Sequence, residues 1–176
     1  MKYRYTILLI LGMISGSALK GQSIDSLSSK VIFEAIALKK KLTEGSFTGM
    51  EGTVKFAIDD LSNSAFKVCI DASTLNSGLK MRDKHLRGED FFYVEKYPDI
   101  CFVSESIEKR GDQFITKGNL TIRDVTRPIE IPFSFDANTL EGTIFINRLE
   151  YNLGIEVKTS KASEEASITI ICHLIN

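Results

Sequence analysis

Residues 129–136 read Ile129-Glu130-Ile131-Pro132-Phe133-Ser134-Phe135-Asp136, so a large apolar side chain occupies every second position. Residues 113–122 repeat this spacing with Phe114, Leu120 and Ile122 on one face. Successive side chains of a β-strand point to opposite faces, so a period of two predicts strands with one face against a core. Pro132 cannot donate a ladder hydrogen bond, which places it at an edge, a strand crossing or a bulge.

Runs of this kind continue along the chain, bounded mainly by Gly, Asn, Asp and Ser, and short turns join most of them. We count eight: residues 29–38, 51–59, 64–73, 99–107, 113–122, 127–136, 140–148 and 166–175. The pattern predicts an all-β domain of about eight strands, a number that can close into an eight-stranded antiparallel barrel. Closing eight strands removes the exposed sheet edges and leaves an interior that side chains fill or that one small ligand occupies.

Several runs are apolar on both faces. In residues 29–38, for example, Val31 and Phe33 oppose Ile32 and Ile36. Either a helix, a loop or a second copy in a homodimer covers the outer wall, or the inner face is an extended apolar tunnel. Where both faces are apolar, the sequence does not decide which of them faces the interior.

The N-terminus has the layout of a secretory signal peptide, which we assign to residues 1–21. Lys2 and Arg4 precede an apolar run from Ile7 to Ile14, and small residues follow up to Ala18. The run is too short to span a bilayer. We therefore expect a protein exported to the periplasm or secreted, with one domain over residues 22–176.

The predicted domain is mildly acidic. Residues 1–21 contain three of the 22 basic residues and none of the 23 acidic ones, which leaves a formal charge of −4. Such a domain lacks the basic footprint of a nucleic-acid-binding protein. The expected contact with a membrane is at most peripheral, for instance through Lys39-Lys40-Lys41, for which a solvated strand end is the alternative.

Three cysteines, Cys69, Cys101 and Cys172, lie in strand-like apolar runs without the paired spacing of a metal site. Small buried residues are the favoured interpretation. Cys69 and Cys101 fall on strands that are neighbours in a meander, so one disulfide is geometrically possible in an oxidising compartment.

The one long interruption, residues 74–98, predicts a loop with a short helix. Asp83 can act as its N-cap, Leu86 supplies an apolar contact, and Gly88 ends it. A connection of this length in a small barrel is usually functional.

This loop also carries the most specific sequence motif. It is similar to the pattern R-D-x-H-L-R-x-x-D-F-F-x-V-x-K-Y-P-x-I-x-F-x-S of the YceI-like family, which it matches from Arg82 to Ser104. Residues 118–128 and 142–148 resemble two further blocks of that family. The resemblance covers almost the whole predicted domain. It implies a lipocalin-like barrel that holds an isoprenoid or similar lipid as its ligand, with no cofactor, no metal and no reaction.

The candidate ligand-binding residues line the predicted tunnel or its mouth. They are Arg82, Asp83, His85, Leu86, Arg87, Phe91 and Phe92 of the loop, and the strand residues Phe56, Phe66, Phe102, Phe114, Phe133 and Phe145. Arg82 or Arg87 could hold an anionic head group bidentately. The alternative is an ion-pair network of Arg82, Asp83 and Asp90 that fixes the loop to the wall.

Two other functions are weighed against a lipid carrier. One is a structural or interaction barrel with a filled core, and the other is a small enzyme. With only His85 and His173 in the chain, a zinc site is not indicated, and a Cys101–His85 nucleophile pair has no motif to support it. We therefore predict no catalytic residues.

The chain departs from the family pattern at two places. The first strand begins Ser28-Ser29-Lys30-Val31-Ile32-Phe33, without the histidines that many relatives carry there. Asp124 replaces a common glycine in the second block. These changes leave the head group open: a quinone, a prenyl phosphate, a fatty amide or none.

Overall fold

The computed structural model describes residues 20–37, 41–159 and 161–175. Nearly all of the predicted signal peptide lies outside the described residues, as do Lys39 and Lys40 of the basic run.

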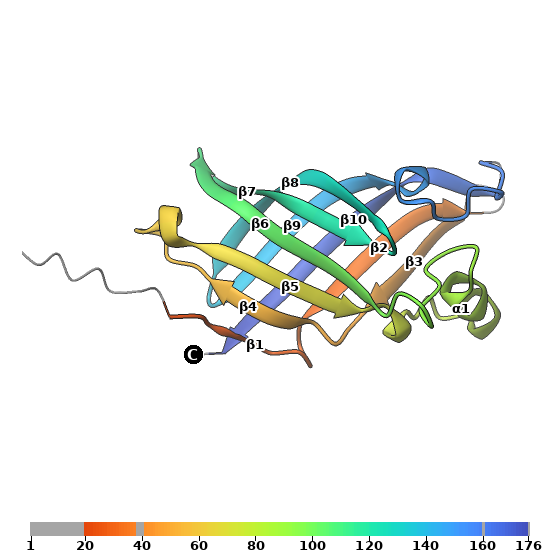
Figure 1. Ribbon diagram of the computed structural model, residues 1–176, viewed down its shortest axis with the longest axis horizontal. Coiled ribbons are helices and arrows are strands. Elements are labelled where there is room, and N and C mark those ends of the chain that lie inside the picture. Colours follow the sequence, from red (N-terminus) through yellow and green to blue (C-terminus); the bar gives the residue numbers. More distant parts are fainter. Residues whose placement is uncertain (1–19, 38–40, 160, 176) are drawn as a thin grey trace, which may run out of the picture.

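The described chain forms one strongly curled antiparallel sheet and one short α-helix (Figure 1). Its strands are β1 Ser23–Ile24, β2 Lys30–Ala37, β3 Lys41–Phe47, β4 Glu51–Lys55, β5 Ala65–Asp71, β6 Asp99–Arg110, β7 Gln113–Ile122, β8 Val125–Asp136, β9 Thr139–Asn147 and β10 Ala162–Ile175. The helix α1 covers Lys80–Arg87, and single 3-10 turns cover Leu61–Asn63 (η2), Ala72–Thr74 (η3) and Arg148–Tyr151 (η4).

The sheet is a meander that curls until its first strands meet its last. Its order is β3-β2-β10-β9-β8-β7-β6-β5-β4, and every pair is antiparallel. β1 pairs with the end of β10, and Gln22, just before β1, bridges to Val54 of β4. This contact links the two sides of the curled sheet.

All eight predicted runs contain strands, and the lipocalin-like all-β prediction is confirmed, although the strand count is too low. β1 and β3 were not predicted. The inward positions of β3 are Thr43, Gly45 and Phe47, so the strand shows no apolar alternation. Gly45 is required by its partner strand, because a Cβ there would lie 2.2 Å from Cζ of Phe33.

The predicted helix exists, but its start differs from the prediction. Leu79 is the N-cap residue and offers no side-chain cap, while Asp83 lies within the helix. The N-cap assignment of Asp83 is therefore wrong. The helix ends before Gly88 as predicted, with Gly88 in extended rather than left-handed backbone. None of the helices in the described ranges is long and apolar enough to cross a membrane.

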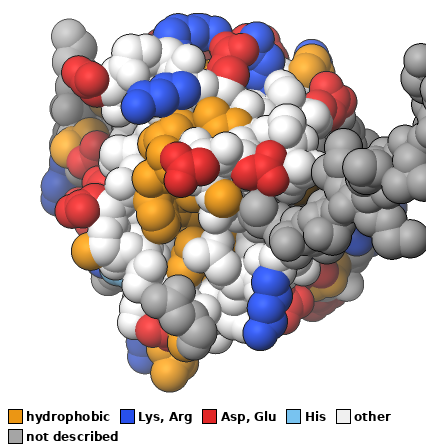
Figure 2. Space-filling model, turned by 90° about the vertical axis from the view of Figure 1, so that its left-hand side faces the viewer, with side chains coloured by type: hydrophobic (Ala, Val, Ile, Leu, Met, Phe, Trp, Pro, Cys, Tyr) orange, Lys and Arg blue, Asp and Glu red, His pale blue; other side chains and the backbone are white. Residues whose placement is uncertain are grey.

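One end of the curled sheet is closed by aromatic side chains. Phe56 packs against Phe114, Phe133 and Phe135 with ring centroids 5.1–5.5 Å apart, and Phe66 packs against Phe133 at 5.6 Å. We call these five rings the aromatic plug. It lies at the left-hand end in Figure 1, and Figure 2 shows the outside of that end, where acidic side chains stand over an apolar band.

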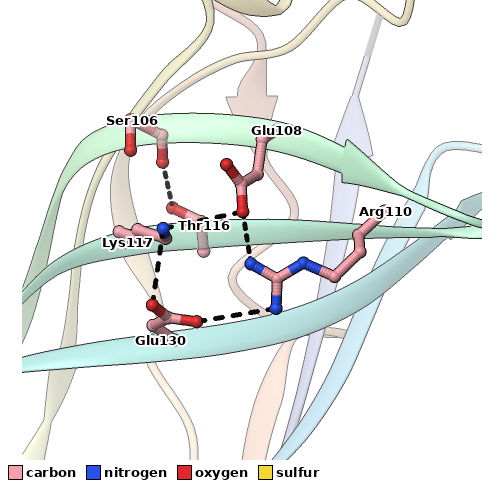
Figure 3. A network of polar contacts seen from close by, with 6 residues as sticks. All are labelled: Ser106, Glu108, Arg110, Thr116, Lys117 and Glu130. Atoms are coloured by element: carbon pink, nitrogen blue, oxygen red, sulfur yellow. Dashed lines mark hydrogen bonds and ion pairs between the residues drawn. The ribbon is translucent and has the colours of Figure 1, made fainter.

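The outer face of β6, β7 and β8 carries a polar network (Figure 3). Lys117 lies 3.6 Å from Glu108 and 3.5 Å from Glu130, and Arg110 contacts both carboxylates. Exposed pairs of this kind contribute little stability, about 0–1 kcal/mol each. They mark this face as solvated, with the opposite face turned to the interior.

Candidate functional site

The interior of the sheet holds a large apolar cavity of about 1290 Å³. Inward positions of nearly every strand line it, and among them are Val31, Phe33 and Ala35 of β2 and Ile168 and Ile170 of β10. The structure thus resolves the parity that the sequence left open: the odd positions of β2 and the even positions of β10 face inward.

Small inward side chains leave this space empty. Gly142 of β9 lines the cavity, as do Thr116 of β7, Ala35 of β2 and Ala166 of β10. Gly142 cannot be enlarged, because a Cβ there would lie 2.6 Å from the carbonyl oxygen of Pro132. No side chain therefore projects from this position of β9 into the cavity.

The cavity opens at the end opposite the aromatic plug. Residues of α1 line the opening on one side, and residues of the segment 148–163 line it on the other. In Figure 1 both segments lie at the right-hand end of the sheet. The result is a pocket with one apolar, closed end and one open end.

On the helix side, α1 is fixed by hydrogen bonds around Ser77. The buried carboxylate of Asp83 accepts from the backbone N–H of Ser77 at 2.8 Å and from its hydroxyl. Arg82 donates through Nε to Ser77 Oγ at 2.7 Å, to the Ser77 carbonyl, and to Thr43 Oγ1 of β3 at 3.3 Å. Arg87 donates to the carbonyl oxygen of Leu75.

These contacts also set the ionisation of Asp83. Burial opposes the charged carboxylate, but the hydrogen bonds from Ser77 and the nearby Arg87 and Arg82 guanidiniums outweigh it. The pKa of Asp83 therefore lies below its ordinary value. Asp83 is thus a charged anchor that holds the helix against the wall.

The ion-pair network of Arg82, Asp83 and Asp90, given above as the alternative, is replaced by this arrangement. Arg82 and Asp83 share Ser77, whereas the side chain of Asp90 is exposed. The ion pairs found among the described residues lie on the outer face of β6–β8 instead.

On the other side of the opening, Arg148 organises the segment that follows β9. Its side chain is only 8% exposed, and it lines the cavity. Its guanidinium donates, at 2.6–3.4 Å, to the carbonyl oxygens of Leu153, Gly154, Val157, Ala162 and Ser163. Burial lowers the pKa of Arg148, yet a guanidinium stays charged in a protein. The Arg148 guanidinium thus supplies the hydrogen-bond donors that these backbone carbonyl groups would otherwise lack.

The sequence did not single out Arg148 as a candidate. Its position carried a signal, because it continues the inward parity of Leu140, Gly142, Ile144 and Ile146 along β9. A charged residue in register with a buried apolar face has to find internal partners.

The two sides of the opening touch each other at Phe91. Gly154, with φ +59°, donates to the carbonyl oxygen of Asp90 at 2.6 Å, and a Cβ there would lie 2.6 Å from the Phe91 ring. Arg123 donates to the carbonyl oxygens of Phe91 at 2.9 Å and Asn152 at 3.2 Å. The loop after α1 and the segment 148–163 are thereby held together along one flank.

The candidate residues predicted from the sequence divide into four groups. Those that line the cavity are Arg82, His85, Leu86, Phe66, Phe91, Phe92, Phe102 and Phe133. Phe56 and Phe114 are buried in the aromatic plug, with Phe66 and Phe133. Asp83 and Arg87 anchor α1 from behind. The prediction that Phe145 lines the cavity is wrong. Its side chain is 75% exposed, because the inward positions of β9 are those of Ile144 and Ile146.

His85 is the most accessible polar candidate at the opening. It is exposed, lines the cavity and lies edge-on to Phe91, with ring centroids 5.1 Å apart. His173 lies instead on β10, where its Nδ1 is 3.0 Å from Thr139 Oγ1.

Cys172 agrees with the favoured prediction of a small buried residue, whereas the other two cysteines differ from it. Cys69 and Cys101 pair across β5 and β6 and form a disulfide, the possibility that their strand positions left open. Cys172 is a buried free thiol that lines the cavity. Burial raises the pKa of Cys172 to about 11, which keeps it protonated and unreactive.

Cys101 forms a disulfide with Cys69, so its sulfur cannot act as the nucleophile of a pair with His85. Across the described ranges, no group of three His, Cys, Asp or Glu side chains is placed to hold a metal ion.

The strand order, the curl of the sheet and the one-ended apolar cavity define a lipocalin-like β-barrel. The family model of the YceI-like domain matches residues 23–174, and the chain belongs to the YceI-like family.

Curated relatives match about half of the chain. A UPF0312 protein of Pectobacterium atrosepticum is 39% identical over 89 residues, which are 49% of this chain and 45% of that protein. Protein YceI of Salmonella newport is 36% identical over 87 residues, 49% of this chain and 46% of that protein. The chain thus aligns with slightly less than half the length of these relatives.

Solved structures match nearly the whole fold. BcnA of Burkholderia cenocepacia superposes with a TM-score of 0.78 at 26% identity, over 87% of this chain and 99% of that chain. A polyisoprenoid binding domain from Saccharophagus degradans superposes with a TM-score of 0.66 over 86% of this chain and 95% of its own. At 16% identity, the second likeness shows the fold alone.

Proposed function

We propose that the protein is a carrier that holds one isoprenoid or similar long apolar lipid in its cavity, with the tail toward the aromatic plug. The observation that carries this proposal is the apolar cavity of about 1290 Å³, closed at one end and open between α1 and the segment 148–163. It exceeds the usual small-molecule pocket of about 300–1,000 Å³. The similar fold described as a polyisoprenoid binding domain supports the same class of ligand.

Burial of the tail alone supplies enough affinity. Each buried CH₂ contributes about 0.8 kcal/mol, so one five-carbon isoprene unit offers roughly 4 kcal/mol before ordering costs. A few units account for tight binding without any polar contact.

The head group contributes less in this proposal. All three guanidinium nitrogens of Arg82 already donate to Ser77 and Thr43, so Arg82 is not free to hold a phosphate in a bidentate manner. Arg87 does not line the cavity, and it donates instead to the carbonyl oxygen of Leu75. His85, exposed at the opening, is the group best situated to meet a quinone oxygen or another polar head.

We also propose that the protein works outside the cytoplasm, in the periplasm or after secretion. The layout of residues 1–21 supports export. The Cys69–Cys101 disulfide agrees with it, since disulfides persist in oxidising compartments.

The alternative, a structural barrel with a filled core, fits the structure less well, because its interior holds a continuous cavity. Native mass spectrometry tests the choice. The purified protein, mixed with geranylgeraniol, is expected to gain the mass of one molecule, and organic extraction is expected to release an apolar chain that co-purifies. A protein that never takes up or retains an apolar chain is not a lipid carrier.

A further inference from the structure

The opening of the cavity is surrounded by apolar and basic side chains that face solvent. We call this set the open rim. Its exposed apolar members are the lining residues Ile36, Leu79 and Met81, together with Leu42, which pairs with Ile36, and Ile155, which precedes the lining residue Glu156. Its exposed lysines are Lys41, Lys80, Lys158 and Lys161. They come from four places in the chain: the end of β2, the start of β3, α1 with its N-cap, and the segment 148–163.

The apolar side chains of the open rim are largely exposed to solvent, where they contribute nothing to the core. Met81 projects from α1 with its side chain 89% exposed, and Ile36 and Leu42 face each other across β2 and β3 as exposed neighbours. Single exposed apolar residues are normal, but a group around one opening marks a binding surface.

The charges on the rim oppose the charge of the whole domain. The predicted domain is acidic, yet the four exposed lysines of the rim all line the opening. Among described residues, Glu156 is the acidic side chain that lines it. At the opposite end, acidic and basic side chains both surround the apolar surface (Figure 2).

We propose that the open rim docks on an anionic lipid bilayer, so that the cavity opens directly onto the membrane. Apolar side chains can enter the head-group region while lysines extend beside them to lipid phosphates. Each lysine near an anionic surface strengthens binding about fivefold at moderate salt. This inference rests on the proposed function for its purpose, since docking gives a lipid a path that avoids water.

The docking test uses lipid-free protein, so it does not depend on cavity filling. In vesicle flotation, the chain is expected to bind mixed phosphatidylcholine–phosphatidylglycerol vesicles, to bind pure phosphatidylcholine vesicles weakly, and to be released by salt, because screening weakens attraction between charges. The double variant Lys80→Gln/Lys158→Gln is expected to lose about 20-fold in partition. The matched variant Lys55→Gln/Lys67→Gln, at the plugged end, is expected to change it less than about twofold.

A second pair of variants tests the apolar contribution. Met81→Ser is expected to lower partition about tenfold. Leu27→Ser removes an equally exposed side chain, 94% exposed, from the loop between β1 and β2 and is expected to leave partition unchanged.

The outcomes separate docking from carriage. Flotation that ignores phosphatidylglycerol and salt, or that falls equally for both lysine doubles, overturns the docking proposal. So does a dimer in sedimentation that Met81→Ser abolishes, because the rim then contacts a second copy. Geranylgeraniol uptake by the unaltered chain from ethanol, without vesicles, tests the carrier function separately.

Discussion

At the scale of single residues, two buried charged side chains hold the opening of the cavity. Asp83 binds Ser77 on the α1 side, and Arg148 binds five carbonyl groups on the other. The sequence motif marked Asp83 as a candidate site residue, but it did not predict Ser77 as the hydrogen-bond partner of Asp83. A hydrogen bond to Ser77 depends on how the loop folds back, and no local sequence pattern fixes that path.

Arg148→Leu is expected to lower the free energy of unfolding by about 3 kcal/mol, because it leaves several buried carbonyl groups without donors. Urea unfolding at neutral pH measures the loss. Arg127→Leu is the matched control, since Arg127 is exposed and, within the described part of the chain, donates only to the Glu150 carbonyl, at 2.7 Å. Equal losses in the two variants would contradict the anchoring role of Arg148.

Asp83 is expected to make the stability depend on pH. Its folded-state pKa is depressed, so its stabilising contribution is present above the unfolded-state pKa and is lost as pH falls through the folded-state value. Asp83→Asn is therefore expected to be less stable than the unaltered chain near neutral pH, and the gap should narrow below about pH 4. Urea unfolding across this pH range measures it. Asp90→Asn, which alters an exposed carboxylate, serves as the control; a gap independent of pH would contradict the assignment.

At the scale of elements, the period-two pattern predicted the strands that bury apolar side chains and failed where the inward side chains are small or polar. The predicted bounds of β7 match the observed ones, whereas β3 was not predicted because Thr43 and Gly45 occupy its inward positions. Gly45 is small because Phe33 fills the space beside it, and only the pairing of β2 with β3 reveals this.

The disulfide ties together the two strands that flank α1. Cys69 and Cys101 are 32 residues apart, and the loop between them contains the helix and the Phe91–Phe92 turn. Cross-linking a loop of this size limits the unfolded chain and is worth roughly 3–4 kcal/mol. Cys69→Ala/Cys101→Ala is expected to lose about that much stability in urea unfolding. Dithiothreitol should destabilise the unaltered chain and leave the double variant unchanged; sensitivity of the variant to the reductant would contradict this account.

At the scale of the whole molecule, the sequence predicted a curled sheet but could not decide between a filled core and a cavity. The choice depends on how many inward positions carry small side chains at the same level of the barrel. Ala35 of β2 and Ala166 of β10 lie directly opposite each other, and this alignment follows from strand register. Register over such distances is a property of the assembled sheet.

Narrowing the cavity is therefore expected to weaken lipid uptake without unfolding the protein. Ile144→Trp adds a large ring at an inward position of β9, where empty volume can accept it, so the variant should fold and bind an isoprenoid tail more weakly. Thr143→Trp places the same ring on the outer face of the same strand, where Thr143 is exposed, and should bind normally. Native mass spectrometry with geranylgeraniol measures binding, and circular dichroism checks the fold of each variant. If the folded Ile144→Trp protein still takes up one molecule as the Thr143→Trp protein does, the lipid lies elsewhere than in this cavity.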